Sequence, residues 1–139
     1  MDLDRIERTM TLDVPRDEVW AAITEPERIS KWFGKETELD LRPGGSGVFR
    51  WENVEVNVVV EEVDPPRKFS YRWEPSQVPT GGPTTLVEFT LEEVPEGTVL
   101  RLVESGFAEL SPKSREDNDE GWTAELAELQ EYLATRVGA

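Results

Sequence analysis

Residues 63–73, "VDPPRKFSYRW", join a segment rich in valine to a segment rich in aromatic residues, and they indicate the fold class of the chain. The double proline predicts a tight turn, because proline fixes φ and forces the preceding residue out of the α region. After the turn, Phe69, Tyr71 and Trp73 alternate with polar residues, which indicates a strand with one aromatic face. Before the turn, valines alternate at Val54, Val56, Val58 and Val60. We therefore expect an antiparallel pair of strands, with a β-bulge near residues 61–62 where Val63 breaks the alternation.

The same alternation predicts strands on both sides of this pair. The segments concerned are residues 5–14, 36–41, 48–53, 86–94 and 98–107. In the second of them, Thr37, Leu39 and Leu41 are expected to share one face. Between the first and second strands, "RDEVWAAI" and "PERISKWF" read as two short helices, each preceded or opened by a proline.

Residues 121–137, "GWTAELAELQEYLATRV", predict a long C-terminal helix preceded by a polar connection, residues 108–120. Its apolar residues recur on a single helical face: Trp122, Leu126, Leu129, Leu133 and Val137. Consecutive strands with short turns imply an antiparallel meander, and only the helices can cover its apolar face. The prediction is one α+β domain, residues 1–139, with a curved seven-stranded sheet around the C-terminal helix and a cavity between them.

Composition excludes several classes of site. The 139 residues contain no cysteine and no histidine, so disulfides, thiolate or imidazole metal sites and histidine-dependent triads are excluded. Thirty acidic against fifteen basic residues give a net charge of −15, which repels nucleic acids and anionic membranes. No apolar run approaches the ~20 residues of a membrane span, and the charged N-terminus lacks the apolar core of a secretory signal. We expect a cytoplasmic protein without a metal or other cofactor.

Four segments together resemble a known family: "VPRDEVWAAITEPERISKWFG", "RPGG", "VDPPRKFSYRW" and "GTVLRLVESGF…EGWTAELAELQEYL". They are similar, in this order and over nearly the whole chain, to stand-alone proteins related to the activator of the heat-shock-protein-90 ATPase. That family lies in the START-like, or SRPBCC, superfamily. The resemblance implies a helix-grip fold, often with an internal cavity. It implies less about activity, because relatives include lipid carriers, hormone receptors and polyketide cyclases.

Aromatic side chains are the first candidates for a ligand site. Those expected to line a pocket, or to guard its mouth, are Trp32, Phe33, Phe69, Tyr71, Trp73, Phe89 and Trp122, together with Leu126 of the helix. The alternative is an ordinary aromatic core, since each such ring buries ~150–250 Å². Both readings stay open, because ligand pockets are themselves lined by such residues.

Two charges in apolar phases form the second candidate. In the helix-grip fold the first and last strands are antiparallel neighbours, and pairing Leu12 with Leu100 would place Arg8 opposite Glu104. Directly opposed Cβ atoms lie ~4.5–5.5 Å apart, so the two charges would neutralise each other. We predict a close Arg8–Glu104 pair. It would serve either as a structural salt bridge or as a polar anchor for a ligand's carbonyl or hydroxyl group.

Loops supply weaker candidates. Residues 74–85, rich in proline and glycine, are either a lid or a plain hairpin tip. Residues 42–47, "RPGGSG", are expected to be a hairpin connection, because their spacing fits no phosphate-binding motif. Lys31 and Lys35 are expected to lie on a solvated helix face.

Three functions follow as hypotheses. The first is the binding of a small apolar or amphipathic ligand between the sheet and the helix. The second, carried by the resemblance alone, is a protein-interaction module that regulates a chaperone of the heat-shock-protein-90 type. The third is a cyclase- or hydrolase-like enzyme in which Glu104 is the general base and Arg8 or Tyr71 the electrophilic partner. The missing histidine favours binding over catalysis, and no residue is assigned as catalytic.

Overall fold

The computed structural model describes residues 4–33, 36–52, 54–74 and 83–137. Within them the elements follow the predicted order: β1 (Arg5–Leu12), α1 (Arg16–Thr24), α2 (Pro26–Ile29), β2 (Glu36–Leu39), β3 (Ser46–Arg50), β4 (Glu55–Asp64), β5 (Lys68–Trp73), β6 (Thr85–Val94), β7 (Gly97–Ser105), the 3₁₀ helix η1 (Phe107–Glu109) and α3 (Pro112–Val137). The predicted helix-grip architecture is confirmed.

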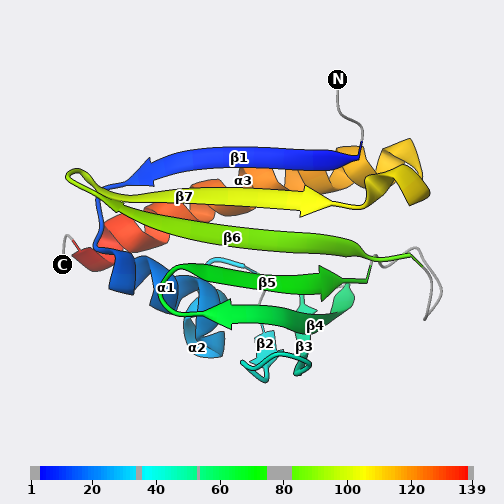
Figure 1. Ribbon diagram of the computed structural model, residues 1–139, viewed down its shortest axis with the longest axis horizontal. Coiled ribbons are helices and arrows are strands. Elements are labelled where there is room, and N and C mark those ends of the chain that lie inside the picture. The colour runs from blue at the N-terminus through cyan, green and yellow to red at the C-terminus, as the bar shows by residue number, and fades with distance from the viewer. Residues whose placement is uncertain (1–3, 34–35, 53, 75–82, 138–139) are drawn as a thin grey trace.

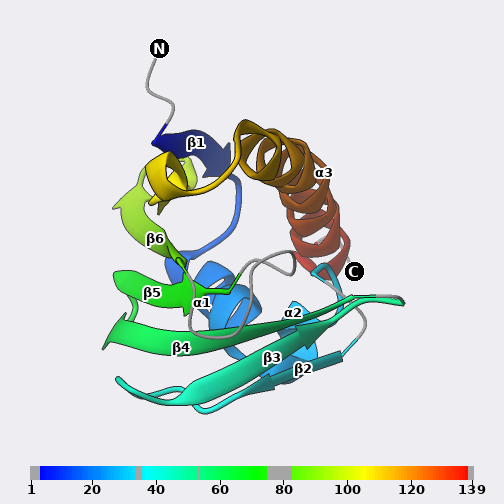
Figure 2. The same ribbon diagram turned by 90° about the vertical axis from the view of Figure 1, so that its right-hand side faces the viewer.

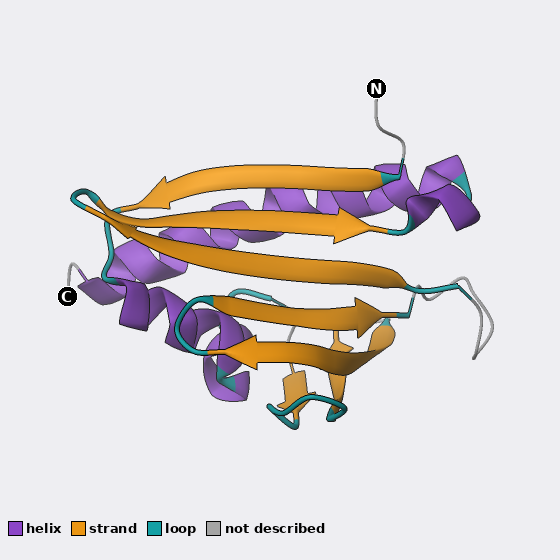
Figure 3. Ribbon diagram, in the orientation of Figure 1, coloured by secondary structure: helices purple, strands orange, loops and turns teal. Residues whose placement is uncertain are grey.

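The described strands form one seven-stranded antiparallel sheet in the order β1-β7-β6-β5-β4-β3-β2. Figure 1 shows α3 running behind the strands, and Figure 2 shows the sheet curving around the side on which all the helices lie. In Figure 3 the helices cover one face of the sheet only. This arrangement gives each strand one buried face and one face toward solvent, which explains the period-two pattern in the sequence.

The turn between β4 and β5 has the predicted form. The Arg67 backbone N–H donates to the Asp64 carbonyl at 2.8 Å, and the Pro65–Pro66 peptide bond is cis. Val60 pairs with Tyr71 but Glu62 pairs with Ser70, so the extra residue of the predicted bulge lies between Val60 and Glu62. The turn and bulge keep the buried valines of β4 opposite the aromatic face of β5.

Two residues that were predicted to share a strand face lie outside the strands. Leu41 and Val54 are exposed, because β2 ends at Leu39 and β4 begins at Glu55, so neither residue lies in a strand. The glycine-rich segment 42–47 does connect β2 to β3 as a hairpin, and Gly44 and Gly45 exchange backbone hydrogen bonds of 2.8 Å with Val60 of β4.

The register of β1 against β7 differs from the prediction by two residues. Leu100 lies opposite Met10 rather than Leu12, and Leu12 lies opposite Thr98. The hairpin between β6 and β7 fixes this register, because Gly97 adopts φ +138° where a Cβ atom would lie 2.2 Å from the Leu12 carbonyl oxygen. Thr98 also donates its hydroxyl to the Val14 carbonyl at 2.7 Å. A two-residue shift leaves the same side chains facing the core but changes every partner.

Helix α3 begins at Pro112 rather than at the predicted Gly121. Proline suits the first turn of a helix, and the Ser111 hydroxyl accepts the Ser114 backbone N–H at 3.2 Å. The predicted apolar face is otherwise confirmed, because its described side chains are buried: Trp122, Leu126, Leu129 and Leu133. The added N-terminal turns continue this face with polar residues, Ser114 and Asn118, and so bring a polar surface against the sheet.

Candidate functional site: an aromatic pocket beside a buried carboxylate

The Glu104 side chain, near the end of β7, is completely buried and lies under α3. Trp122 donates its indole N–H to Oε1 at 2.8 Å, and Thr85 donates its hydroxyl to Oε2 at 2.5 Å. The Asn118 amide donates to both oxygens, at 3.2 Å and 3.0 Å. All three donors are neutral, so hydrogen bonds rather than a cation compensate the carboxylate.

Burial raises the pKa of Glu104, and the hydrogen bonds from Thr85, Trp122 and Asn118 oppose that rise. The same carboxylate acts on Tyr71, whose hydroxyl pKa lies well above its ordinary value because of burial first and the charge of Glu104 second. Glu104 is therefore a group that takes up a proton more readily than a free glutamate does, in surroundings built to hold it in place.

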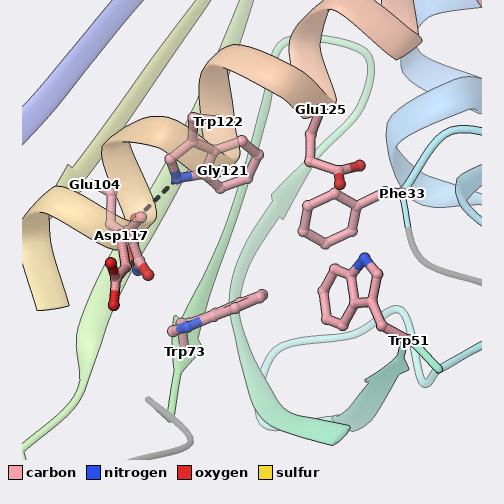
Figure 4. Close-up of a pocket in the computed structure, with 9 residues that line it drawn as sticks. Phe33, Trp51, Trp73, Glu104, Asp117, Gly121, Trp122 and Glu125 are labelled. Atoms are coloured by element: carbon pink, nitrogen blue, oxygen red, sulfur yellow. Dashed lines mark hydrogen bonds between the residues drawn. The ribbon is translucent and has the colours of Figure 1, made fainter. Parts of the chain in front are cut away.

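A pocket of about 230 Å³ lies between this carboxylate and solvent. Its lining is formed by four aromatic rings and a group of mainly acidic residues (Figure 4): Phe33, Trp51, Trp73, Trp122, Glu104, Asp117, Asn118, Gly121 and Glu125. The rings of Trp51 and Trp73 face the α3 side chains across the space (Figure 4). The pocket thus brings together β5, β7, α3 and the segments that follow α2 and β3.

Phe33 is the centre of the aromatic wall. Its ring stacks on Trp122 at 5.4 Å between centroids, with 11° between the ring planes. It meets Trp51 edge-on at 5.0 Å and Trp73 at 6.1 Å. Rings packed in this way hold one another in fixed rotamers, so the wall is preorganised rather than formed on binding.

Two further carboxylates stand on the helix side of the pocket. Burial and the neighbouring charge of Glu128 raise the pKa of Glu125, while a hydrogen bond from Trp51 opposes the rise. Asp117 accepts from the ammonium group of Lys113 at 3.1 Å, one helical turn away. Glu125 is half-buried, so its charge acts on the pocket with only partial solvent screening.

The structure brings four of the predicted site residues into the pocket lining: Phe33, Trp73, Glu104 and Trp122. Four others are buried in the core beneath it: Phe69, Tyr71, Phe89 and Leu126. Trp32 does not guard the mouth, because its indole N–H donates to the Ala22 carbonyl at 2.8 Å and anchors the helical segment. Most of the predicted space between sheet and helix is therefore filled by core side chains, and the pocket occupies one end of it.

The predicted Arg8–Glu104 pair is wrong. Arg8 lies opposite Leu102, and Glu104 lies opposite Ile6. The Arg8 guanidinium forms an ion pair with Asp119 of α3 and donates to the Thr123 hydroxyl at 3.4 Å. The two-residue register shift separates the charges, and the early start of α3 supplies each with a partner that the sequence pattern did not indicate.

Five lining residues were not predicted: Trp51, Asp117, Asn118, Gly121 and Glu125. Asn118 precedes Trp122 by four residues, and this spacing would have placed it beside Trp122 had the helix been extended back to Pro112. The sequence signal that was missed is therefore the helix start, Ser111-Pro112.

Within the described residues, no three carboxylates gather in a way that could hold a metal ion, and none of the helices is both long and apolar enough to cross a membrane. The proposed lid, residues 74–85, falls mostly on residues 75–82, which lie outside the described part of the chain. Lys31 is exposed as expected, and Lys35 also lies outside the described residues.

The sequence profile of the family described as "Activator of Hsp90 ATPase homolog 1-like protein" matches residues 13–134. The chain belongs to this family. The match begins just after β1 and runs from α1 into the last turns of α3, so it includes all the pocket-lining residues and the buried carboxylate.

The chain is also similar to individual known proteins. One curated relative is the "Uncharacterized protein C1711.08" of Schizosaccharomyces pombe, which is 30% identical over 102 residues, or 73% of this chain and 29% of the relative. The chain thus spans less than a third of that protein's length. CalU16 of Micromonospora echinospora is 31% identical with a TM-score of 0.71, covering 96% of this chain and 76% of CalU16. Protein MLL2253 of Mesorhizobium loti shares the fold, at 24% identity and a TM-score of 0.85, covering 94% of this chain and 97% of that one.

Proposed function

We propose that this family member is a cytoplasmic START-like domain that binds a small apolar or amphipathic molecule in the aromatic pocket. The observation that carries the proposal is the wall formed by Phe33, Trp51, Trp73 and Trp122 around a space of about 230 Å³. Ligand sites are concave, mostly apolar and equipped with a few fixed polar groups, and Glu104 with its donors supplies such a group.

Binding can be measured with a neutral apolar probe, N-phenyl-1-naphthylamine, whose fluorescence rises in apolar surroundings. Gly121 is exposed, lines the pocket and has no other atom within 4 Å of the position of a Cβ atom. Gly121→Phe should therefore fill the pocket and abolish the fluorescence rise. Ala127→Phe adds the same ring to the same helix at an exposed position outside the pocket and should leave the rise unchanged. Equal responses from both variants would refute the pocket as the binding site.

Native mass spectrometry of the protein purified from its own host gives the second readout. A bound molecule that is retained in Ala127→Phe and lost in Gly121→Phe would identify the ligand directly. A wild-type protein that carries nothing and binds no apolar probe would remove the proposal.

Catalysis is the second candidate, and the raised pKa of Glu104 favours it. A carboxyl group that is buried beside an aromatic pocket has the properties of a general acid or base. Arg8 no longer supports this assignment as an electrophile, because it pairs with Asp119. The discriminating variant is Glu104→Gln, which should abolish turnover of an identified ligand while leaving its binding measurable.

The regulation of a chaperone ATPase is suggested only by the family's description. Its test is the ATPase rate of the host's chaperone of the heat-shock-protein-90 type, with and without this protein. An unchanged rate removes this candidate and leaves the pocket proposal untouched.

A further inference from the structure

We infer that the aromatic pocket selects a small organic cation, a protonated amine or quaternary ammonium group carried on an apolar body. This inference rests on the proposed ligand binding and names the class of ligand. It is drawn from the charges and rings that line the pocket.

The charged groups of the lining all have the same sign. Glu104, Asp117 and Glu125 contribute carboxylates, and no lysine or arginine is among the described lining residues. Lys113, which is largely exposed, forms an ion pair with Asp117 of the lining, and Arg8 forms an ion pair with Asp119. Glu128 adds a further negative charge beside Glu125. Glu104 and Glu125 form no ion pair within the described residues, so an anionic ligand would meet a lining of net negative charge.

The aromatic rings select the same sign of charge. The faces of Trp and Phe rings carry the negative part of the ring quadrupole, and they attract ammonium groups within about 6 Å of the centroid. Trp51 and Trp73 pack edge to face, with centroids 6.1 Å apart and planes at 66°, and both rings line the pocket. Phe33 packs against Trp51 in the same way, with centroids 5.0 Å apart. Aromatic walls of this kind, next to carboxylates, suit a cation with an apolar body.

Glu104 supplies the inner end of such a site. Its carboxylate is buried, and this desolvation raises its pKa although the hydrogen bonds from neutral donors oppose the rise. A cation brought to within a few ångströms would stabilise the charged form, so binding should release a proton from the fraction of molecules in which Glu104 is protonated. Glu125 and Asp117, on the helix side, extend the negative potential toward the mouth of the pocket.

Three probes of nearly equal shape test the sign of the selected charge: 2-phenylethylammonium, neutral 2-phenylethanol and anionic phenylacetate. Quenching of the pocket tryptophans, or calorimetry, at low salt measures each affinity. We expect the ammonium probe to bind about tenfold tighter than the alcohol, and we expect phenylacetate not to bind. Added salt should reduce the difference in affinity between the ammonium probe and the alcohol.

The outcomes separate this inference from the function on which it rests. If the alcohol binds as tightly as the ammonium probe, the cation preference is wrong and the apolar pocket stands. If phenylacetate binds best, the cation preference is also wrong. If none of the three binds, the inference fails, and the neutral naphthylamine probe decides separately whether the pocket binds apolar molecules.

Variants test whether the carboxylates of the pocket lining cause the preference for a cation. Glu104→Gln and Glu125→Gln should each weaken the binding of the ammonium probe about three- to tenfold and weaken the binding of 2-phenylethanol less, so that the preference for the cation falls. Glu125 is half-buried, so Glu125→Gln should fold and its affinity can be measured even if Glu104→Gln does not fold. Glu131→Gln, an exposed position on the same helix, removes the same charge outside the pocket and should have no effect. An equal loss in Glu131→Gln would attribute the preference to the net charge of −15 and overturn the inference.

Discussion

Trp122 donates its indole N–H to Glu104 Oε1 across 2.8 Å and so joins the long helix to the last strand of the sheet. The same indole stacks on Phe33 in the pocket wall and meets Phe89 of the core at 5.9 Å. One side chain therefore links the buried carboxylate, the pocket and the core, because its two ends have different chemistry.

The variant Trp122→Phe should separate these roles. It keeps an aromatic ring but removes a donor from a buried carboxylate, which costs about 1–3 kcal/mol of the free energy of unfolding. It should also raise the pKa of Glu104 further, because one of the bonds that lower it is lost. Denaturant unfolding measures the first effect, and titration of the Glu104 carboxyl by carbon NMR measures the second.

Trp32→Phe is the matched control. Trp32 is also buried and also donates an indole bond of 2.8 Å, but to the Ala22 carbonyl. It should lower stability by a similar amount and leave the titration of Glu104 unchanged. A shift of that titration in both variants, or in neither, would contradict the assigned role of Trp122.

Glu104→Gln should change how stability depends on pH. Because the folded-state pKa is raised, the folded protein binds this proton more tightly than the unfolded chain does. The resulting stabilisation is complete below the ordinary glutamate pKa, near about 4.3, and is lost as the pH rises through the folded-state value. Glutamine does not titrate, and its amide can donate to Thr85 while its oxygen accepts from Trp122.

The difference in melting temperature, variant minus wild type, should therefore increase from about pH 4 toward about pH 8. Thermal unfolding of both proteins over this range measures it. Glu120→Gln, exposed on the same helix, is the control for the loss of one carboxylate away from the pocket. A flat difference for Glu104→Gln would mean that its carboxyl has the same pKa in the folded and unfolded chain.

The sequence predicts the fold well because the fold depends on periodicity. Two patterns predict the fold: the alternation around residues 63–73 and the apolar face of residues 122–133. An error of a few residues in strand pairing does not change either prediction, because only the phase of the pattern matters. The bulge after Val60 was predicted from a break in this phase, and the structure confirms it. The same phase placed Trp73 and Glu104 on the inner face of the sheet, and the apolar face of the helix placed Trp122 beside them.

Partners of individual side chains depend on register and on helix ends, which the pattern does not fix. Glu104 was correctly recognised as an inward charge, but its partner was assigned by a register two residues from the observed one. The observed donors Asn118 and Thr85 are polar residues that carry no periodic signal. From the sequence alone, the polar turns before Trp122 are predicted to be a loop. Their helical structure is explained only when the buried carboxylate in the sheet beneath them is known.

Arg8 provides a test of the corrected pairing. A double-mutant cycle of Arg8→Ala with Asp119→Ala should give a coupling energy of about 0.2–1 kcal/mol, because the pair is only partly buried, with side chains 34% and 38% exposed. The parallel cycle of Arg8→Ala with Glu104→Gln should give a smaller coupling, since the two residues share no hydrogen bond. Urea unfolding of the single and double variants measures both cycles. A larger coupling to Glu104 would restore the pairing that the register excludes.

Two glycines should respond in opposite directions to the same substitution. Gly97→Ala places a Cβ atom 2.2 Å from the Leu12 carbonyl oxygen, at φ +138°, and should lower the free energy of unfolding by about 3 kcal/mol or more. Gly121→Ala, within α3 and with no other atom within 4 Å of the added Cβ atom, should raise it by about 0.5–1 kcal/mol through helix propensity. Chemical unfolding of the two variants beside the wild type measures both changes. If Gly97→Ala were tolerated, the hairpin between β6 and β7 would not be what fixes the register of β1, and the explanation for the separation of Arg8 from Glu104 would fail with it.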